Sequence, residues 1–514
     1  MTPNRRSPSD PNDRELRLWR VGRALTLAFV AAVLVAGSVF YGLVVLLGFN
    51  EIDTTVKLDA KTLFDLVKLS FGVVAGSGAL VALVVAYRRQ RVDEAGAHRE
   101  ATRLHTERFS QAVDKLGSDS PAVRLGGVHA LAGLADDAPD DSLRQTCIDV
   151  LCAYLQLPFT PDPGDDPTQQ EEHHRYLAFR KVRHTILRLI GDHYRRPQGT
   201  HRSWQGCDLD LAGVTIDASM DFSDAIFSGG TVYFGGATFS GGAVDFSGAT
   251  FSGGAVDFSG ATFSGGAVDF SGARFSGGTV YFVRATFSGS TADSGSMVDF
   301  GGAMFSGGKV TFRLATFSGG TVNFSGATFS GGTVNFRSAM FSGGTVYFSG
   351  ASFSGGAVDF SGARFSGGTV YFSGATFSGG AVDFSGARFS GGTVNFRLTT
   401  FSGGTVNFGG ATFSGGTVDF RLARFSGSTV YFSGATFSGG TVDFSGATFS
   451  GGTVDFSGAR FSGGTVDFSG ATFSGGTVNF GEAIGLIPDG LLTAVGTPVP
   501  ATVVLASAWL PPVP

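Results

Sequence analysis

The chain of 514 residues contains little cysteine, tryptophan or lysine, and it has no histidine after residue 201. Three cysteines, Cys147, Cys152 and Cys207, are too few for a disulfide framework and include no CxxC pair, so we interpret them as small core residues in a reducing compartment. A net charge of −5 excludes a general nucleic-acid binder. Without histidine, the long segment after residue 201 cannot hold a Ser–His catalytic pair.

Motifs for catalysis and cofactor binding are also missing. The sequence has no GxxxxGK[ST], no HExxH and no nucleophile elbow. His173 and His174 are adjacent, and on a helix they would point about 100° apart, which makes them a poor pair of metal ligands. We therefore predict no catalytic, cofactor-binding or metal site, and a protein that is not an enzyme.

Glycine and phenylalanine are in excess, with 80 Gly and 51 Phe. The Gly share is roughly twice the usual ~7%. Glycine does not recur at every third position with proline, which excludes collagen, and the many Phe exclude a flexible Gly/Ser linker. Of the 51 Phe, 43 lie between Phe222 and Phe480, so the bias belongs to one segment.

Two apolar runs near the N-terminus, 24–48 and 69–87, are each long enough for a membrane span of about 20 residues. Arginines flank both runs on their outer sides, whereas the only basic residues of the segment 49–68 between them are lysines. The positive-inside rule therefore predicts that both termini are cytoplasmic. We predict a basic tail (1–23), a transmembrane hairpin with an external loop (49–68), and a multi-pass protein of the bacterial inner membrane. Gly72 and Gly76 form a GxxxG pair, which packs the two spans on each other or forms a homodimer face.

Residues 88–200 have the pattern of a cytoplasmic α-helical domain. An apolar stripe ends at Gly117, and Ser120 followed by Pro121 is a typical helix start. Another helix is expected at 142–157, before Pro158. The last helix is basic, which predicts a solvated face or contact with acidic lipid headgroups. Its cations are Arg180, Lys181, Arg183 and Arg188.

From Phe222 onward the spacing between Phe residues alternates between 5 and 7, which gives a repeat of 12 residues. A short fixed period is typical of a solenoid. Within each unit, Val-x-Phe and Ala-x-Phe alternate as strands do, so Val, Ala and Phe point inward and the middle residues, such as Asp443 and Thr448, point outward. The Ser-Gly pairs between them suit the corners of the coil.

The units resemble the pentapeptide-repeat family, as Val442–Gly446 and Ala447–Gly451 illustrate side by side. Leu209/Leu211 begins the pattern in an aliphatic form. The resemblance implies a right-handed quadrilateral β-helix over 205–480, followed by a cap or tail at 481–514. Together, hairpin, helices and repeat resemble membrane-anchored bacterial members of actinobacterial type.

Two extra residues follow every second pentapeptide, so a coil contains either two of the twelve-residue units, with four faces, or one unit, with two faces. We favour two units and four faces, because a two-residue turn barely bridges two sheets ~10 Å apart. Phe222–Phe480 then forms about ten and a half coils and a rod ~50 Å long at the usual strand spacing. An insertion at 289–297 is expected to form a loop, whose role stays open.

These features predict a membrane-anchored, non-enzymatic scaffold that presents its β-helix to an unknown protein partner. The family resemblance implies an alternative, since some members mimic DNA and bind DNA gyrase through an acidic surface. Here Asn and Tyr replace many of the outward Asp, and Arg occupies the centres of other stretches, so a strongly acidic rod is absent and we expect no direct contact with nucleic acid. A third reading is a structural product of repeat expansion without a dedicated ligand.

Overall fold

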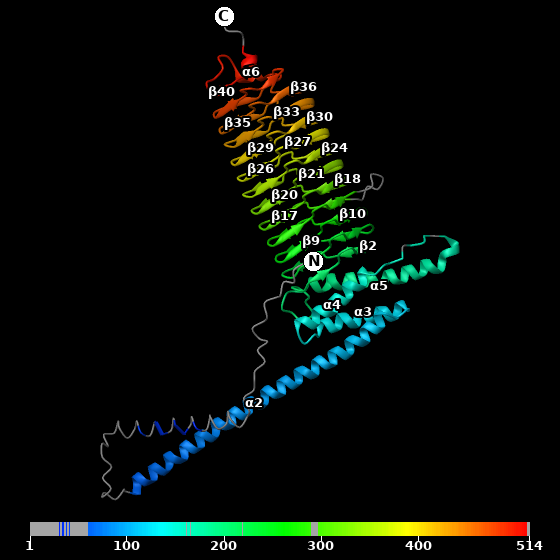
Figure 1. The fold of residues 1–514 in the computed structure, drawn as a ribbon, viewed down its shortest axis with the longest axis vertical. Helices are drawn as coiled ribbons and strands as arrows, with labels where there is room; N and C mark the ends of the chain where they lie inside the picture. Colours follow the sequence, from blue (N-terminus) through cyan, green and yellow to red (C-terminus); the bar gives the residue numbers. More distant parts are fainter. Residues whose placement is uncertain are drawn as a thin grey trace, which may run out of the picture. The chain divides into compact units, whose positions relative to one another are not determined.

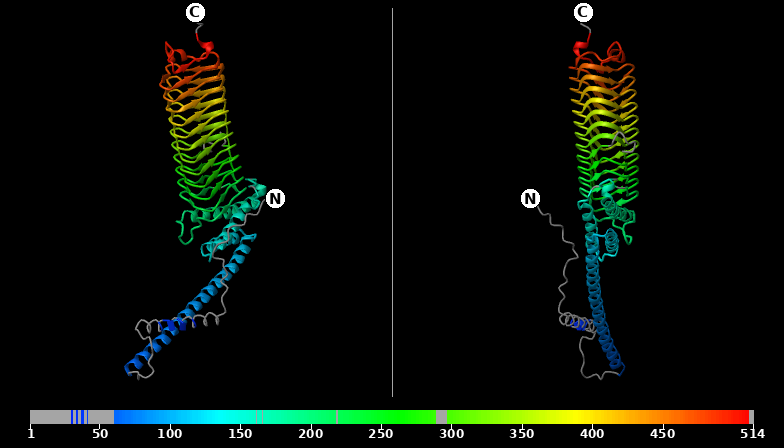
Figure 2. Two further views of the ribbon diagram at one scale, coloured as in Figure 1. Left: turned by 60° about the vertical axis from the view of Figure 1, so that its left-hand side comes forward. Right: turned by 90° about the vertical axis from the view of Figure 1, so that its right-hand side faces the viewer.

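The computed structural model describes residues 60–160, 162–164, 166–217, 219–288 and 297–510, together with residues 30, 33, 34, 37, 38 and 41. The chain divides into two compact units, residues 1–104 and 105–514. The second unit contains a small helical segment and a β-solenoid, in which successive coils stack in parallel (Figure 1; Figure 2).

The predicted inner-membrane localisation is wrong, and the predicted transmembrane hairpin is not shown. The first expected span, 24–48, lies mostly outside the described residues, and the second, 69–87, falls within helix α2 (Ala60–Leu116). This helix continues from the apolar stretch into the charged sequence 88–116. Among the helices that the structure describes, none has the length and apolar character needed to cross a membrane. Gly72 and Gly76 lie on α2, and the predicted homodimer through them stays a prediction.

The helical segment begins with the end of α2 and continues through three further α-helices. These are α3 (Pro121–Asp136), α4 (Asp141–Gln156) and α5 (Gln170–Tyr194), with the short 3-10 helix η1 (Pro167–Gln169) before α5. Local chemistry sets the bounds: Pro121 occupies the first turn of α3, the Asp140 side chain caps α4 by accepting from the backbone N–H of Leu143 at 2.8 Å, and Pro158 follows α4. Leu131, Ile148 and other apolar side chains form the core of the helical segment.

Each regular coil of the solenoid contains two of the repeat units, as favoured from the sequence: Phe263 pairs with Phe239 before it and with Phe287 after it. The coils begin at Leu209 and number about 12. This is more than the ten and a half expected, because the aliphatic start of the pattern contributes strands as well. The insertion falls between β14 and β15, and its residues 289–296 lie outside the described part of the chain.

The first face is a 13-stranded parallel sheet built from every second Val-x-Phe stretch. Its strands are β1 (Leu209–Asp210), β5 (Val232–Tyr233), β9 (Ala255–Asp257), β13 (Thr279–Tyr281), β17 (Lys309–Thr311), β20 (Thr333–Asn335), β23 (Ala357–Asp359), β26 (Ala381–Asp383), β29 (Thr405–Asn407), β32 (Thr429–Tyr431), β35 (Thr453–Asp455), β38 (Thr477–Asn479) and β40 (Val503–Val504).

The second and third faces merge into one 16-stranded sheet, because from β18 onward one long strand spans both faces through a bulge. The short strands of the second face are β2 (Thr215–Ile216), β6 (Thr238–Phe239), β10 (Thr262–Phe263), β14 (Thr286–Phe287) and β39 (Ile484–Gly485). Those of the third face are β3 (Met220–Asp221), β7 (Val244–Asp245), β11 (Val268–Asp269) and β15 (Met297–Asp299). The long strands are β18 (Thr316–Asn323), β21 (Met340–Tyr347), β24 (Arg364–Tyr371), β27 (Arg388–Asn395), β30 (Thr412–Asp419), β33 (Thr436–Asp443) and β36 (Arg460–Asp467).

The fourth face is an 11-stranded sheet formed by the remaining Ala-x-Phe stretches. Its strands are β4 (Ile226–Phe227), β8 (Thr250–Phe251), β12 (Arg274–Phe275), β16 (Met304–Phe305), β19 (Thr328–Ser330), β22 (Ser352–Ser354), β25 (Thr376–Ser378), β28 (Thr400–Ser402), β31 (Arg424–Ser426), β34 (Thr448–Ser450) and β37 (Thr472–Ser474).

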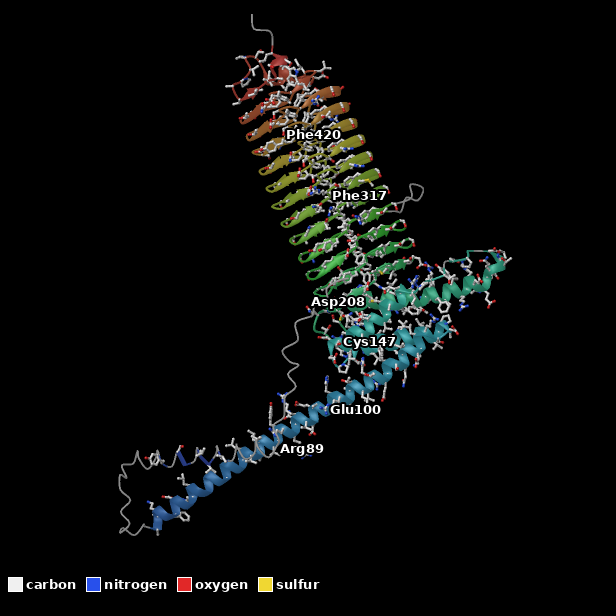
Figure 3. All side chains as sticks on the ribbon, viewed as in Figure 1. Arg89, Glu100, Cys147, Asp208, Phe317 and Phe420 are labelled. Atoms are coloured by element: carbon white, nitrogen blue, oxygen red, sulfur yellow. The ribbon has the colours of Figure 1, made fainter. Side chains whose placement is uncertain are left out.

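Stacked Phe rings fill the solenoid, and the predicted inward and outward positions are confirmed. Phe317, labelled in Figure 3, and its equivalent Phe341 one coil later stack with ring centroids 4.8 Å apart and planes inclined by 3°. Phe312 of the first face meets Phe324 of the third edge to face, at 5.7 Å and 89°. Such pairs contribute about 0.5–1.5 kcal/mol beyond area burial. The Phe columns therefore bind coil to coil and face to face.

Both ends of the solenoid are covered. At the C-terminal end, α6 (Leu491–Val495), β40 and the 3-10 helix η2 (Ser507–Trp509) close the last coil. The Trp509 ring lies 5.8 Å from Phe480, and its indole N–H donates to the carbonyl of Gly485 at 3.0 Å. At the other end, Tyr194 of α5 contacts Phe227 with ring centroids 5.0 Å apart.

Asp217, in the first coil, joins α5 to the solenoid. The Tyr176 hydroxyl donates to its carboxylate at 2.6 Å, Arg180 donates to it at 3.2 Å, and the His184 Nε2 atom lies 3.8 Å away. The pKa of the Asp217 carboxyl is well below its usual range because of His184, Tyr176 and Arg180, although burial acts in the opposite direction. Arg180, predicted to be solvated or to contact lipid headgroups, is therefore part of an internal ion pair.

The two kinds of glycine corner should respond differently to a methyl group. Gly404 (φ +74°) lies where an added Cβ would be 2.0 Å from the carbonyl oxygen of Gly380 in the preceding coil, whereas at Gly410 (φ +65°) it would meet open space. Leu398 and Leu422 already adopt φ near +60° at positions equivalent to Gly410. We expect Gly404→Ala to destabilise the solenoid by about 3 kcal/mol or more and Gly410→Ala by about 1 kcal/mol. Denaturant unfolding and hydrogen exchange measure the free energy of unfolding of both variants. Equal decreases in stability would contradict the crowding of the Gly-Gly corner.

Docking of α5 should weaken in acid. A carboxyl whose folded pKa is lowered stabilises the folded state above its unfolded value near 4, and this stabilisation is lost as the pH falls toward the folded pKa. We expect Asp217→Asn to cost about 2 kcal/mol at pH 7 and to differ less from the unchanged protein toward pH 3. Hydrogen exchange of α5 from pH 7 to 3 tests this, with the exposed Glu171→Gln as control. An Asp217→Asn loss that is independent of pH would refute the assignment.

Candidate interaction surface

The outward side chains at the centres of the Val-x-Phe stretches lie in two columns, one on the first face and one on the third. Strand register aligns the first-face column as Asp210, Tyr233, Asp257, Tyr281, Thr311, Asn335, Asp359, Asp383, Asn407, Tyr431, Asp455 and Asn479. The third-face column is Asp221, Asp245, Asp269, Asp299, Asn323, Tyr347, Tyr371, Asn395, Asp419, Asp443 and Asp467.

The outward arginines at strand centres lie on other faces. Arg364, Arg388 and Arg460 belong to the second face, and Arg274 and Arg424 to the fourth. This agrees with the sequence, in which these arginines occupy the centres of the Ala-x-Phe stretches and the Asp occupy those of the Val-x-Phe stretches. In the folded coil the two kinds of residue alternate around the axis, so the carboxylates are concentrated on two faces.

The third face carries an acidic ladder, defined here as Asp221, Asp245, Asp269 and Asp299. These four residues are in register on adjacent strands, which lie ~4.8 Å apart. Arg195 pairs with Asp221 at 2.5 Å, and the Asn323 amide donates to Asp299 at 3.0 Å. Within the described ranges, neither Asp245 nor Asp269 has a Lys, Arg or His at ion-pair distance. Aligned like charges repel one another, so this ladder favours a positively charged ligand.

Two tyrosines follow the ladder on the same face. The rings of Tyr347 and Tyr371 stack with centroids 5.1 Å apart and planes inclined by 8°. Both side chains are half-buried, and one face of each ring stacks on the other ring. Tyrosine has a large apolar area with a polar tip and is enriched at protein interfaces. The third face therefore combines carboxylates with an aromatic pair.

The outward Asp and Asn side chains also have a structural role that the sequence interpretation missed. The Asp269 carboxylate accepts a hydrogen bond from the backbone N–H of Ser271 at 2.7 Å, and Asp443 accepts from Ser445 at 2.8 Å. Each is an Asx turn that supports the corner of the coil. The sequence does contain the pattern that indicates this turn, namely an Asp or Asn two residues before a corner residue. Tyr347 and Tyr371 cannot make the Asx-turn hydrogen bond, and they contribute ring stacking to the third face in its place.

Reactive groups are few in the described part of the second unit. Among the residues that the structure describes, no three or more His, Cys, Asp and Glu side chains are arranged to hold a metal ion. His173 binds the Asp162 carboxylate at 2.6 Å. The three cysteines are free, as expected, and burial raises the thiol pKa to about 12 at Cys147 and Cys152. These two cysteines are therefore protonated thiols at neutral pH.

Comparison with known proteins finds one family, described as pentapeptide repeats, with nine copies. The model matches residues 241–293, 343–382, 379–418 and 415–453. The solenoid is a pentapeptide-repeat domain. Each coil of this domain joins four pentapeptides and two extra Gly-Thr-type pairs, which explains why it contains two of the units seen in the sequence. No curated protein and no solved structure matches the chain.

An Asp-to-Asn change in the pentapeptide-repeat domain should separate charge from structure. Asn retains the oxygen that accepts the Asx-turn hydrogen bond, whereas Ala removes it. We expect Asp269→Ala to lower the free energy of unfolding by about 1 kcal/mol, and Asp269→Asn to change it by less than about 0.5 kcal/mol. Thermal and denaturant unfolding monitored by circular dichroism measure both. Equal destabilisation by both changes would show that the charge, rather than the turn, stabilises this corner.

Proposed function

We propose that the pentapeptide-repeat domain is a non-enzymatic interaction module whose third face binds a basic protein partner. The observation that carries this proposal is the acidic ladder, because Asp245 and Asp269 lie side by side without a cation partner in the described residues. A basic partner would relieve their repulsion and gain charge-assisted hydrogen bonds. Tyr347 and Tyr371 supply apolar contact area along the same column.

The stiffness of the domain supports the same role. Its outward columns rest on fully buried Phe, so the spacing of the binding groups is set before a partner arrives. Preorganised groups lose little conformational entropy on binding. A surface of this kind suits a scaffold that holds a partner at a defined position, without chemistry of its own.

The test uses the full chain and two matched triple variants. We expect Asp245→Asn, Asp269→Asn and Asp299→Asn together to weaken capture of a basic partner at least tenfold, because the charges are lost while the Asx turns remain. The first-face triple Asp257→Asn, Asp359→Asn and Asp383→Asn is the control, with the same change in net charge. Affinity capture followed by quantitative mass spectrometry at 50 and 200 mM salt measures the difference.

Two results would contradict the proposal. If both triple variants lose the same partner equally, net charge and not the third face governs binding. If no protein depends on either triple, the domain has no such interface, and the reading as a product of repeat expansion without a dedicated ligand would be favoured.

The DNA-mimic alternative has weaker support. Duplex DNA carries one negative charge per about 1.7 Å, whereas the acidic ladder has one carboxylate per coil, about 4.8 Å apart, and Asn323 interrupts it. This alternative requires that the chain inhibit supercoiling by DNA gyrase. Supercoiling that is unaffected at micromolar protein would eliminate it.

A further inference from the structure

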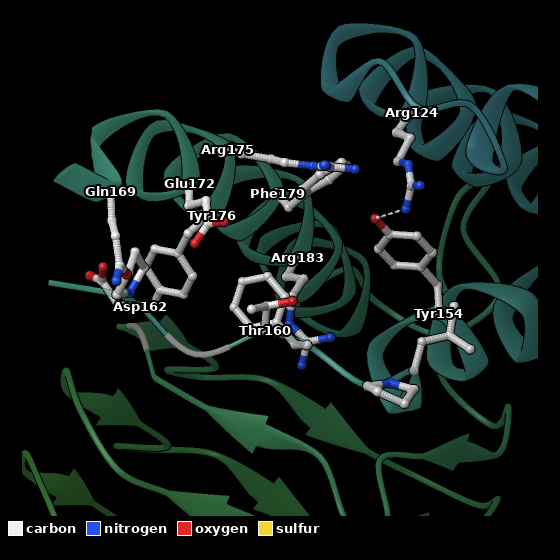
Figure 4. Close-up of a pocket in the computed structure, with 14 residues that line it drawn as sticks. Arg124, Tyr154, Thr160, Asp162, Gln169, Glu172, Arg175, Tyr176, Phe179 and Arg183 are labelled. Carbon is white, nitrogen blue, oxygen red and sulfur yellow. Dashed lines mark hydrogen bonds between the residues drawn. The ribbon is translucent and has the colours of Figure 1, made fainter.

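A cavity of about 720 Å³ lies in the helical segment, between α3, α4 and α5 and the chain that follows α4 (Figure 4). Cavities that hold small molecules usually have volumes of about 300–1,000 Å³. Three arginines, Arg124, Arg175 and Arg183, line this cavity together with several aromatic rings. It is separate from the third face of the solenoid, on which the proposed function rests.

Arg183 is the most unusual of these residues, because it is only 5% exposed. Its guanidinium lies over the Phe159 ring, 4.9 Å from the centroid, and Nη2 donates to the Thr215 carbonyl at 3.2 Å. No carboxylate in the described chain lies within ion-pair distance of it. Burial lowers its pKa, which reflects the cost of a desolvated cation. A buried guanidinium with unused donors facing a cavity favours an anion there.

Arg124 and Arg175 supply two further positive charges at the same cavity. Their guanidinium groups lie 4.6 and 5.7 Å from the centroid of the Phe179 ring. Arg124 also donates to the Tyr154 hydroxyl at 3.1 Å, drawn as a dashed line in Figure 4. Neither arginine pairs with a carboxylate among the residues described. The Arg124 Nε–H donates to the Ser118 carbonyl. The rings orient the planar guanidinium groups, and the Arg124 Nη2 and the Arg175 guanidinium have no hydrogen-bond partner among the described residues, so they can bind a ligand.

The acidic residues of the cavity lie at its other end. Figure 4 shows Asp162 and Glu172 near Gln169, away from Arg124 and Tyr154. Asp162 is already bound by His173 at 2.6 Å and by the backbone N–H of Gly164 at 2.9 Å. The arginine end therefore has an excess of positive charge.

We propose that this cavity binds a small phosphorylated ligand through Arg124, Arg175 and Arg183. Guanidinium groups bind phosphate oxygens in a bidentate manner, and three of them suit a ligand with more than one phosphate. The cavity volume leaves room for the organic part beside the Phe159 and Phe179 rings. A second cavity of about 400 Å³ shares Phe159 and Arg183 and reaches Thr215 in the first coil. Through Arg183 the ligand would also brace α5 against the solenoid.

The test is titration of the full chain with pyrophosphate and with ATP, followed by calorimetry and thermal unfolding. We expect saturable binding of at least one of these probes, with a rise in melting temperature. Arg175→Gln, at an exposed position, and Arg183→Lys should each weaken binding at least tenfold. Arg188→Gln is the matched control on α5, because Arg188 pairs with Asp192 at 3.2 Å outside the cavity; it should change affinity less than twofold.

The alternatives have distinct outcomes. If the chain binds neither probe at millimolar concentration, or if Arg188→Gln weakens binding as much as Arg175→Gln, the site is refuted. Equal or tighter binding of citrate would replace phosphate by carboxylate and overturn the assignment of ligand class. If Arg183→Lys loses helical structure, the affinities of Arg175→Gln and Arg124→Gln for the probes still test the site. Because the third-face Asn variants leave this cavity unchanged, their result and this one are independent.

Discussion

The stacking of each Phe ring on its equivalent one coil away is the interaction on which the rest of the pentapeptide-repeat domain depends. Phe317 and Phe341 belong to successive coils, and their rings lie 4.8 Å apart because parallel pairing keeps the coils in register. A ring that moved one position would point outward and leave its column. The core thus determines the register of all faces together. It also explains why the second and third faces can merge into long strands without disturbing the interior.

A regular interior has a consequence for the exterior. Because Val, Ala and Phe recur at nearly all inward positions of the regular coils, most of the variation lies at strand centres and corners. Some of this variation is structural: Leu398 and Leu422 occupy corners with positive φ, and Asp or Asn supports the Asx turns. The negative charge of the acidic ladder and the Tyr347–Tyr371 pair go beyond what the coil needs, since Asn makes the same Asx turn as Asp. They are therefore the outward features most suited to recognising a partner.

Much of the solenoid could be predicted from the sequence, because its contacts are local in the repeat. Alternation assigned Val442, Phe444, Ala447 and Phe449 to the interior, and turn length favoured a coil of two units with four faces. The membrane prediction failed, although it rested on equally simple counting: the apolar run 69–87 is part of α2, which extends into charged sequence. Hydropathy of a segment describes its composition and does not determine where its helix begins or ends.

The repeat, the inward and outward positions and the lack of histidine in the solenoid follow from residue type and spacing alone. Which outward residues become neighbours depends on how the coils fold. Asp245 and Asp269 are separated by a full coil of chain and meet because that coil returns the chain to the same face. In the sequence Arg183 is one of several cations on a basic helix, but packing of α5 against Phe159 and the first coil buries it. Both results depend on contacts between distant segments, which local patterns do not specify.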